Sequence, residues 1–128
     1  MQRSFLPFIL IGLFVCGCGH STATAIVNGT VRFDGQPLAD ASVVFEPTDG
    51  SRPSAGTTDA SGKYTLRFNP TTEGAIAGEH IVSIRTAPAE PDPENPAVER
   101  LPSKYHSATE LKATLKSGRQ TIDFDLTP

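Results

Sequence analysis

Two cysteines and a histidine stand close together near the start of the chain, in residues 14–20, which read FVCGCGH. A structural zinc site needs four ligands, commonly in pairs with two to four residues between the members. One residue separates Cys16 from Cys18, no other cysteine exists, and His80 and His106 show no paired spacing with His20. A disulfide across one residue would close a strained ring. The spacing therefore predicts neither a metal centre nor a redox pair.

The segment that precedes these cysteines has the pattern of an export signal. Met1 and Arg3 supply a short positive start, and residues 5–15, FLPFILIGLFV, carry no charge. A membrane-spanning helix needs about 20 apolar residues, so this run is too short to span a bilayer stably. Its length and flanks are typical of the apolar region of a signal peptide. We expect residues 1–17 to be a signal peptide.

The end of that segment, VCGC at residues 15–18, resembles the lipobox of bacterial lipoproteins. The resemblance implies that Cys18 receives a diacylglyceryl group and that cleavage before it removes Cys16. Two or more acyl chains anchor a protein stably to a membrane. Gly19 in place of aspartate implies sorting to the outer membrane, facing the periplasm or the cell surface. An ordinary signal peptide or an uncleaved anchor is the alternative.

The rest of the chain divides into a polar tether, residues 18–25, and one domain, residues 26–128. A chain of 128 residues favours a single domain. Its formal net charge is −3 with interspersed signs, whereas nucleic-acid-binding proteins usually show a basic patch. We expect no nucleic-acid partner and no cofactor.

Apolar and polar residues alternate through the domain, which is the pattern of half-buried strands. Turn residues separate the runs: Asp34 with Gly35, residues 59–62 with Gly62 in a left-handed conformation, and residues 117–119. About seven short strands with polar turns predict an all-β sandwich. Apolar alternation centres the strands on the following residues: Val27 and Val31; Val43 and Phe45; the two arms of a hairpin around residues 59–62; Val82 and Ile84; Leu111 and Leu115; Ile122, Phe124 and Leu126.

A loop of about 20 residues, residues 87–106, interrupts the strands and is rich in proline and acidic residues. Loops of this length are usually functional or disordered. We expect its first half to be mobile, and Leu101 and Tyr105 to pack. If the domain binds a ligand, Lys104, Tyr105 and His106 are the first candidates, with Arg52 and Arg100 as weaker ones. The alternative is that these residues only pack the loop against a sheet edge.

Two further features have a structural and a functional interpretation. His80 falls in phase with Val82, which predicts a hydrogen-bonded residue at the rim of a strand rather than a ligand. Asp123 and Asp125 lie on the outer face of the last strand. They could bind a cation or face an arginine, but calcium takes six or more oxygen ligands and no acidic loop converges on them. We expect them to be solvated charges.

The domain resembles the carboxypeptidase regulatory-like domain, whose pattern is G-x-V, D-G-x-P-L-x-x-A-x-V and T-D-x-x-G-x-Y. That resemblance implies a transthyretin-like, seven-stranded Greek-key β-sandwich. The matching residues are Gly29, Val31, Asp34, Gly35, Pro37, Leu38, Ala41, Val43, Thr58, Asp59, Gly62 and Tyr64.

No catalytic motif is evident in the sequence. There is no G-x-S-x-G nucleophile elbow and no phosphate-binding loop. Hydroxyisourate hydrolases, which share the transthyretin fold, end in Y-R-G-S, whereas this chain ends in DFDLTP. We therefore expect a non-enzymatic, lipid-anchored envelope module with a structural, adhesion or scaffolding role and an envelope protein or glycan as partner. A carbohydrate- or peptide-binding accessory lipoprotein is the alternative, and a small transthyretin-like hydrolase is a remote one.

Overall fold

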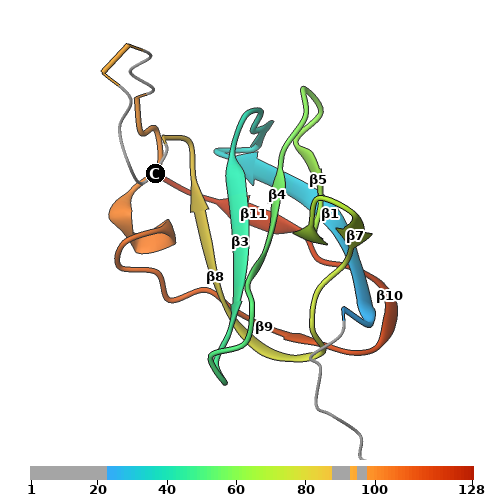
Figure 1. Cartoon of the computed structure of the whole chain (residues 1–128). Helices are drawn as coiled ribbons and strands as arrows, with labels where there is room; N and C mark the ends of the chain where they lie inside the picture. Colours follow the sequence, from blue (N-terminus) through green and yellow to red (C-terminus); the bar gives the residue numbers. More distant parts are fainter. Residues whose placement is uncertain (1–22, 88–92, 95–97) are drawn as a thin grey trace, which may run out of the picture.

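The alternating residues form short strands that assemble into two packed sheets (Figure 1). The structure is a computed structural model that describes residues 23–87, 93–94 and 98–128. The predicted signal peptide, Cys18 and part of the long loop lie outside the described residues. The elements are β1 (Ala25–Phe33), β2 (Gln36–Pro37), β3 (Ser42–Pro47), β4 (Ser54–Thr57), β5 (Lys63–Thr65), β6 (Arg67–Asn69), β7 (Thr72–Glu73), β8 (Gly78–Arg85), the 3₁₀-helix η1 (Ser103–Tyr105), β9 (Lys112–Leu115), β10 (Gly118–Thr121) and β11 (Phe124–Leu126).

The first sheet is built around β1. The hairpin strand β2 and strand β5 pair antiparallel with β1, whereas β10 and β11 pair with it in parallel. Val27 lies opposite Gln120 and Val31 opposite Phe124, so β10 and β11 follow one edge of β1 in a single register. The two ends of the domain sequence are therefore joined along one parallel ladder.

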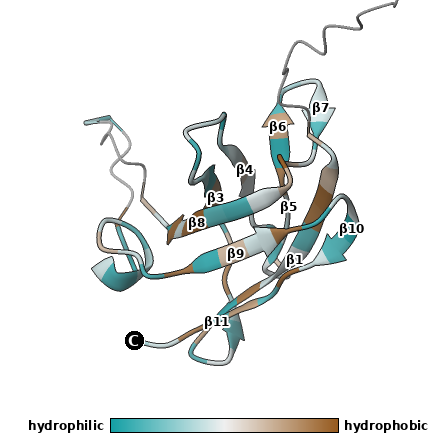
Figure 2. Ribbon diagram, turned by 90° about the horizontal axis from the view of Figure 1, so that it is seen from below, coloured by the Kyte–Doolittle hydropathy of each residue, from teal (hydrophilic) through white to brown (hydrophobic). Residues whose placement is uncertain are grey.

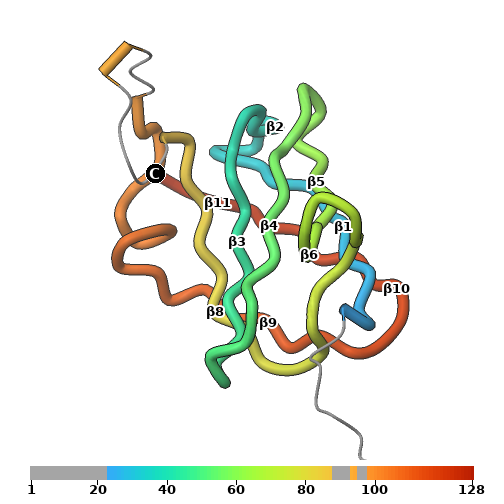
Figure 3. Tube along the Cα trace, viewed as in Figure 1, coloured from blue at the N-terminus to red at the C-terminus, as the bar shows by residue number. Residues whose placement is uncertain are grey.

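The second sheet has the order β7-β6-β4-β3-β8-β9 and is antiparallel throughout. Its central pair is β3 with β8, in which Val43 lies opposite Ile84 and Phe45 opposite Val82. The Cα trace shows β4 and β5 running side by side where the two sheets meet (Figure 3).

The predicted all-β sandwich is confirmed, and the seven expected runs correspond to β1, β3, β4, β5 with β6, β8, β9 and β11, whereas β10 begins within residues 117–119, where we expected a turn. Leu66 separates β5 from β6, and Ile122 with Asp123 separates β10 from β11. The predicted turn at residues 59–62 is present, with Gly62 at φ +76°. The hairpin predicted around it is confirmed in part: β4 pairs antiparallel with β6 across the turn, with Ala55 opposite Arg67, whereas β5 pairs with β1 of the other sheet. The chain changes sheets at this turn, which alternation alone does not reveal.

The core lies between the inward faces of the two sheets (Figure 2). Phe45 is at its centre, 6.5 Å from the ring of Tyr64 and 6.1 Å from the ring of Phe124. The predicted inward sets of β1, β3, β8, β9 and β11 all contribute to it. Leu101 and Tyr105 are also buried, as expected for the second half of the long loop.

The structure differs from the expectation at two boundaries. Ala25, which we placed in the tether, is the first residue of β1 and is fully buried. The N–H of Gly118 donates to the carbonyl of Thr24, so the ordered domain begins slightly earlier than residue 26. Within the described ranges, no helix has the length and apolarity required to cross a membrane.

Candidate functional site

The three residues that we proposed as a ligand site lie on or next to η1, where they hold the C-terminus in place. The hydroxyl of Tyr105 donates to the carbonyl of Thr127 at 3.1 Å and accepts from the N–H of Thr127 at 2.8 Å. His106 Nε2 lies 3.1 Å from the carbonyl of Leu101. The ammonium of Lys104 lies 5.1 Å from the centre of the Tyr105 ring. These contacts account for Tyr105 and His106 as anchors of the loop, and ligand binding by them stays a prediction.

The two weaker candidates lie far apart in the fold. Arg52, between β3 and β4, donates from Nε to the carbonyl of Phe68 at 2.8 Å and lies 5.5 Å from the Phe68 ring centre. Arg100 donates from Nη2 to the carbonyl of Ala39 at 2.9 Å. The structure does not bring Arg52 into the neighbourhood of η1 as a shared site.

Glu99 joins the two ends of the long loop, a role that we did not predict from the sequence. Its Oε1 accepts from the backbone N–H of Thr86 at 2.9 Å and of Leu101 at 3.1 Å, and its Oε2 accepts from the N–H of Ala87 at 3.2 Å. The Thr86 hydroxyl also donates to Oε1 at 2.9 Å. The carboxylate of Glu99 thereby connects the two ends of the long loop where they meet the domain.

A second network joins the two sheets at Tyr64. The Tyr64 hydroxyl donates to the carbonyl of Ile122 at 2.5 Å. A Cβ placed on Gly29 would lie 1.7 Å from that same carbonyl oxygen, so only glycine fits at this position. Burial, and then the negative charge of Asp123, raise the pKa of Tyr64, which keeps the phenol protonated as a donor. Gly29 and Tyr64, two residues of the family-like pattern, thus meet at one carbonyl.

The carbonyl of Ile122 is bonded to the Tyr64 hydroxyl instead of to β1, and this explains the role of Asp123. The N–H of Ile122 donates to the carbonyl of Asn28 at 2.8 Å, as a parallel ladder requires. The next bond of such a ladder would run from the N–H of Thr30 to the Ile122 carbonyl. Instead, Asp123 Oδ1 accepts from the Thr30 N–H at 2.8 Å. Asp123 is exposed, as expected, and in addition accepts the hydrogen bond that the ladder would otherwise lack.

His80 is buried rather than at a strand rim, which corrects the expectation. Its side chain is 1% exposed and packs 5.8 Å from the Phe45 ring. Nε2 lies 2.6 Å from the carbonyl of Ile76, while Nδ1 has no hydrogen-bond partner among the described residues. No group of three or more histidine, cysteine, aspartate or glutamate side chains within the described ranges is placed to hold a metal ion.

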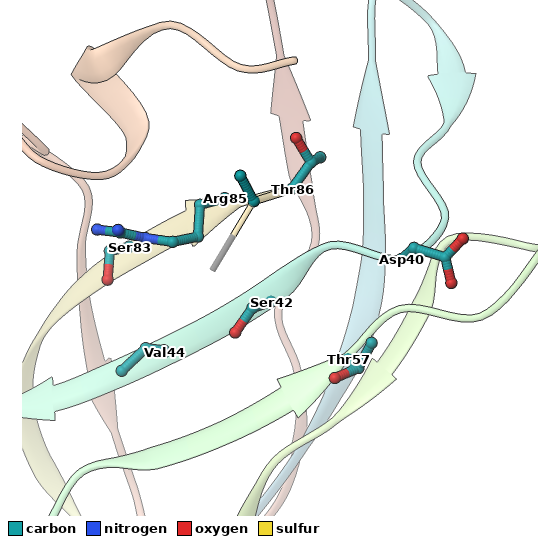
Figure 4. Close-up of a pocket in the computed structure, with 8 residues that line it drawn as sticks. Asp40, Ser42, Val44, Thr57, Ser83, Arg85 and Thr86 are labelled. Atoms are coloured by element: carbon teal, nitrogen blue, oxygen red, sulfur yellow. The ribbon is translucent and has the colours of Figure 1, made fainter. Parts of the chain in front are cut away.

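The outer face of the second sheet is hollowed into a depression of about 560 Å³, lined by hydroxyl, charged and apolar residues (Figure 4). Side chains from three adjacent strands share this face, and Asp40 stands at its rim. The contributing residues are Ser42 and Val44 of β3, Thr57 of β4, and Ser83 and Arg85 of β8. The sequence signal for this face is a set of small hydroxyl residues at outward strand positions, which we did not interpret as a site.

Comparisons with known proteins gave one partial structural similarity that can be described. No protein-family model matches the chain, and no curated protein matches it. It resembles a solved DUF3823 family protein from Parabacteroides merdae, with a TM-score of 0.45 and 15% sequence identity. The match covers 81% of this chain and 46% of that protein, so the chain spans about half of its length.

Proposed function

We propose that this protein is a non-enzymatic, lipid-anchored module of the bacterial cell envelope. The observation that carries the proposal is the short distance in sequence between Cys18 and the folded domain. β1 begins at Ala25, and Thr24 is already bonded to Gly118. Seven residues from the acylated cysteine to β1 span at most about 25 Å. A lipid on Cys18 would hold the β-sandwich close to the membrane surface.

The roles of the conspicuous polar side chains support a binding or scaffolding module rather than an enzyme. Tyr64, Tyr105, Asp123 and Glu99 each bond to backbone groups that hold strands or loops together. Asp59 likewise accepts the N–H groups of its own turn. Such residues stabilise the fold and leave the sheet surfaces to meet a partner.

The strand and turn residues also support a domain of the carboxypeptidase regulatory-like, transthyretin-like kind. Gly29 and Tyr64 meet at the Ile122 carbonyl, and the carbonyl of Gly62 accepts a hydrogen bond from the N–H of Val31. Three residues of the family-like pattern therefore make contacts where β1 and β5 meet. A carbohydrate- or peptide-binding accessory role is the second candidate, which the depression on the second sheet favours.

The anchor can be tested by metabolic labelling with an alkyne fatty acid in a bacterial host. The wild type and Cys16→Ser are expected to incorporate label, and Cys18→Ser is expected to lose it and to leave the membrane fraction. Cys16→Ser is the matched control, because it removes a thiol of the same segment that lies before the cleavage point. Label that persists on Cys18→Ser would overturn the assignment of the anchor.

A further inference from the structure

A straight row of polar side chains crosses the depression on the second sheet. Ser42 of β3 lies directly opposite Arg85 of β8 on one side and opposite Thr57 of β4 on the other. Neighbouring strands are about 4.8 Å apart, so Arg85, Ser42 and Thr57 repeat at that spacing across three strands. We call these three residues the polar row; Figure 4 shows them on one face of the sheet.

The floor beside the polar row is made of small side chains. Ser83, Val44 and Ala55 form the adjacent row in the same register and on the same face. Within the described ranges, the side chains of Ser42, Thr57 and Ser83 make no hydrogen bond to the protein, and neither does that of Arg85. These hydroxyls and the guanidinium are therefore available to a ligand that can approach the sheet closely.

The surface continues beyond β4 because the two sheets touch there. A Cβ on Gly56 would lie 2.5 Å from the carbonyl oxygen of Thr65, so glycine permits the close approach of β4 to β5. A second depression of about 470 Å³ shares Ser42 and Thr57 and extends to Lys63 and Arg67. Cations thus stand at both ends of a stretch lined by hydroxyl groups.

The polar row lies at the end of the sandwich away from the start of β1. Ser42 begins β3, and Thr57 and Arg85 end β4 and β8, near the end of β1 that adjoins β2 (Figures 1 and 3). The nine residues of β1 span on the order of 27 Å. A partner could therefore reach the polar row while the start of β1 stays near the membrane.

We propose that this surface binds an acidic glycan, a polyhydroxylated chain that carries carboxylate groups. Serine and threonine hydroxyls both donate and accept, which suits sugar hydroxyls, and guanidinium binds carboxylate through charge-assisted hydrogen bonds. Arg85, Lys63 and Arg67 outnumber the carboxylates Asp40 and Asp59 that line the two depressions, and Asp59 Oδ1 already accepts the backbone N–H groups of Ser61 and Lys63.

A glycan fits this surface better than an extended peptide. Peptides recognised by sheets add to a free edge through backbone hydrogen bonds. The strands β8, β3 and β4 lie inside the sheet, where their backbone groups pair with one another. These strands present the hydroxyls of Ser42, Thr57 and Ser83 to the depression, together with the apolar side chain of Val44.

Isothermal titration calorimetry of the full chain in detergent tests this inference with three probes of similar length: oligogalacturonate, a neutral malto-oligosaccharide and oligoglutamate. We expect oligogalacturonate to bind more tightly than either of the others. Arg85→Gln is expected to weaken that binding about tenfold, since it removes a charge-assisted hydrogen bond. Thr57→Val keeps the side-chain shape and is expected to weaken binding about threefold to tenfold through the loss of one hydroxyl.

Arg32→Gln is the matched control, because Arg32 is an exposed arginine on β1 of the other sheet. It is expected to leave the affinity for oligogalacturonate unchanged, and all three variants are expected to keep the melting temperature of the wild type. Equal binding of the neutral sugar or of oligoglutamate would overturn the inference, as would no binding or an equal loss in Arg32→Gln. The inference deepens the second candidate function, and its failure would leave the labelling result at Cys18 unaffected.

Discussion

The hydroxyl of Tyr64 and the carbonyl of Ile122, 58 positions apart in the sequence, meet at 2.5 Å where the parallel ladder of the first sheet is interrupted. The bond links β5, the strand after the Asp59–Gly62 turn, to the segment between β10 and β11. It also draws the Ile122 carbonyl toward Gly29, so the N–H of Thr30 pairs with Asp123 instead. A single tyrosine thereby couples the turn, the first strand and the C-terminal strand.

Replacing Tyr64 by phenylalanine should lower the free energy of unfolding by about 1–2 kcal/mol, because it leaves the Ile122 carbonyl without its donor. Urea unfolding followed by circular dichroism measures the change. Thr65→Val, at the exposed neighbouring position, is the control and should stay close to the wild type. Equal stability of Tyr64→Phe and wild type would show that this bond does not contribute.

Gly29→Ala, in β1, should destabilise the folded domain more than Gly35→Ala, in the turn between β1 and β2. The added methyl would meet the Ile122 carbonyl at 1.7 Å, and overpacking costs up to about 3 kcal/mol, occasionally more. Gly35→Ala is the matched control: it has φ +78° but nothing within 4 Å of the new methyl, so only the left-handed backbone penalty of about 1–2 kcal/mol applies. Equal losses in the two variants, measured by thermal unfolding, would contradict the close approach.

Glu99 should hold the base of the long loop in a pH-dependent manner. Burial raises the pKa of Glu99, but hydrogen bonds from Thr86, Ala87 and Leu101 lower it by more, so the pKa lies below the ordinary value of 4.5. A carboxylate with a lowered pKa stabilises the folded state above its unfolded pKa, and this contribution is lost as the pH falls through the folded pKa. We expect the amides of Thr86, Ala87 and Leu101 to lose protection from hydrogen exchange below about pH 4.

The variant Glu99→Gln should show the same loss of protection at neutral pH, because it removes the charge and one acceptor oxygen from the network. Hydrogen exchange followed by nuclear magnetic resonance resolves these amides individually. Glu110→Gln, an exposed acidic residue after η1, is the control and should leave them protected. Unchanged protection in Glu99→Gln would mean that the loop base is held by other contacts.

Tyr105→Phe should loosen the C-terminus while leaving the sandwich folded. The phenol both donates to and accepts from the backbone of Thr127, so its removal should lower the free energy of unfolding by about 1 kcal/mol and speed exchange of the Thr127 amide. Ser107→Ala, at an exposed position just after η1, is the control and should leave the Thr127 amide protected. The same exchange rate in Tyr105→Phe and wild type would contradict the anchoring role.

The sequence by itself determined which residues face inward and where the chain turns. Alternation placed Val27, Val43, Phe45 and Val82 in the core, and Asp34-Gly35 and Gly62 take the positive φ angles that their turns require. These features are local: side chains alternate along a strand with a period of two, and only a few residues tolerate left-handed backbone.

Tertiary structure alone decided which strands pair and which polar groups meet. After the Asp59–Gly62 turn, β5 pairs with β1 and only β6 returns to pair with β4, while β10 and β11 join β1 from 93 positions away. The Tyr64–Ile122 bond, the Glu99 clamp and the polar row all depend on these pairings. Local alternation specifies a face but not a neighbour, since pairing is set by contacts between segments distant in the sequence.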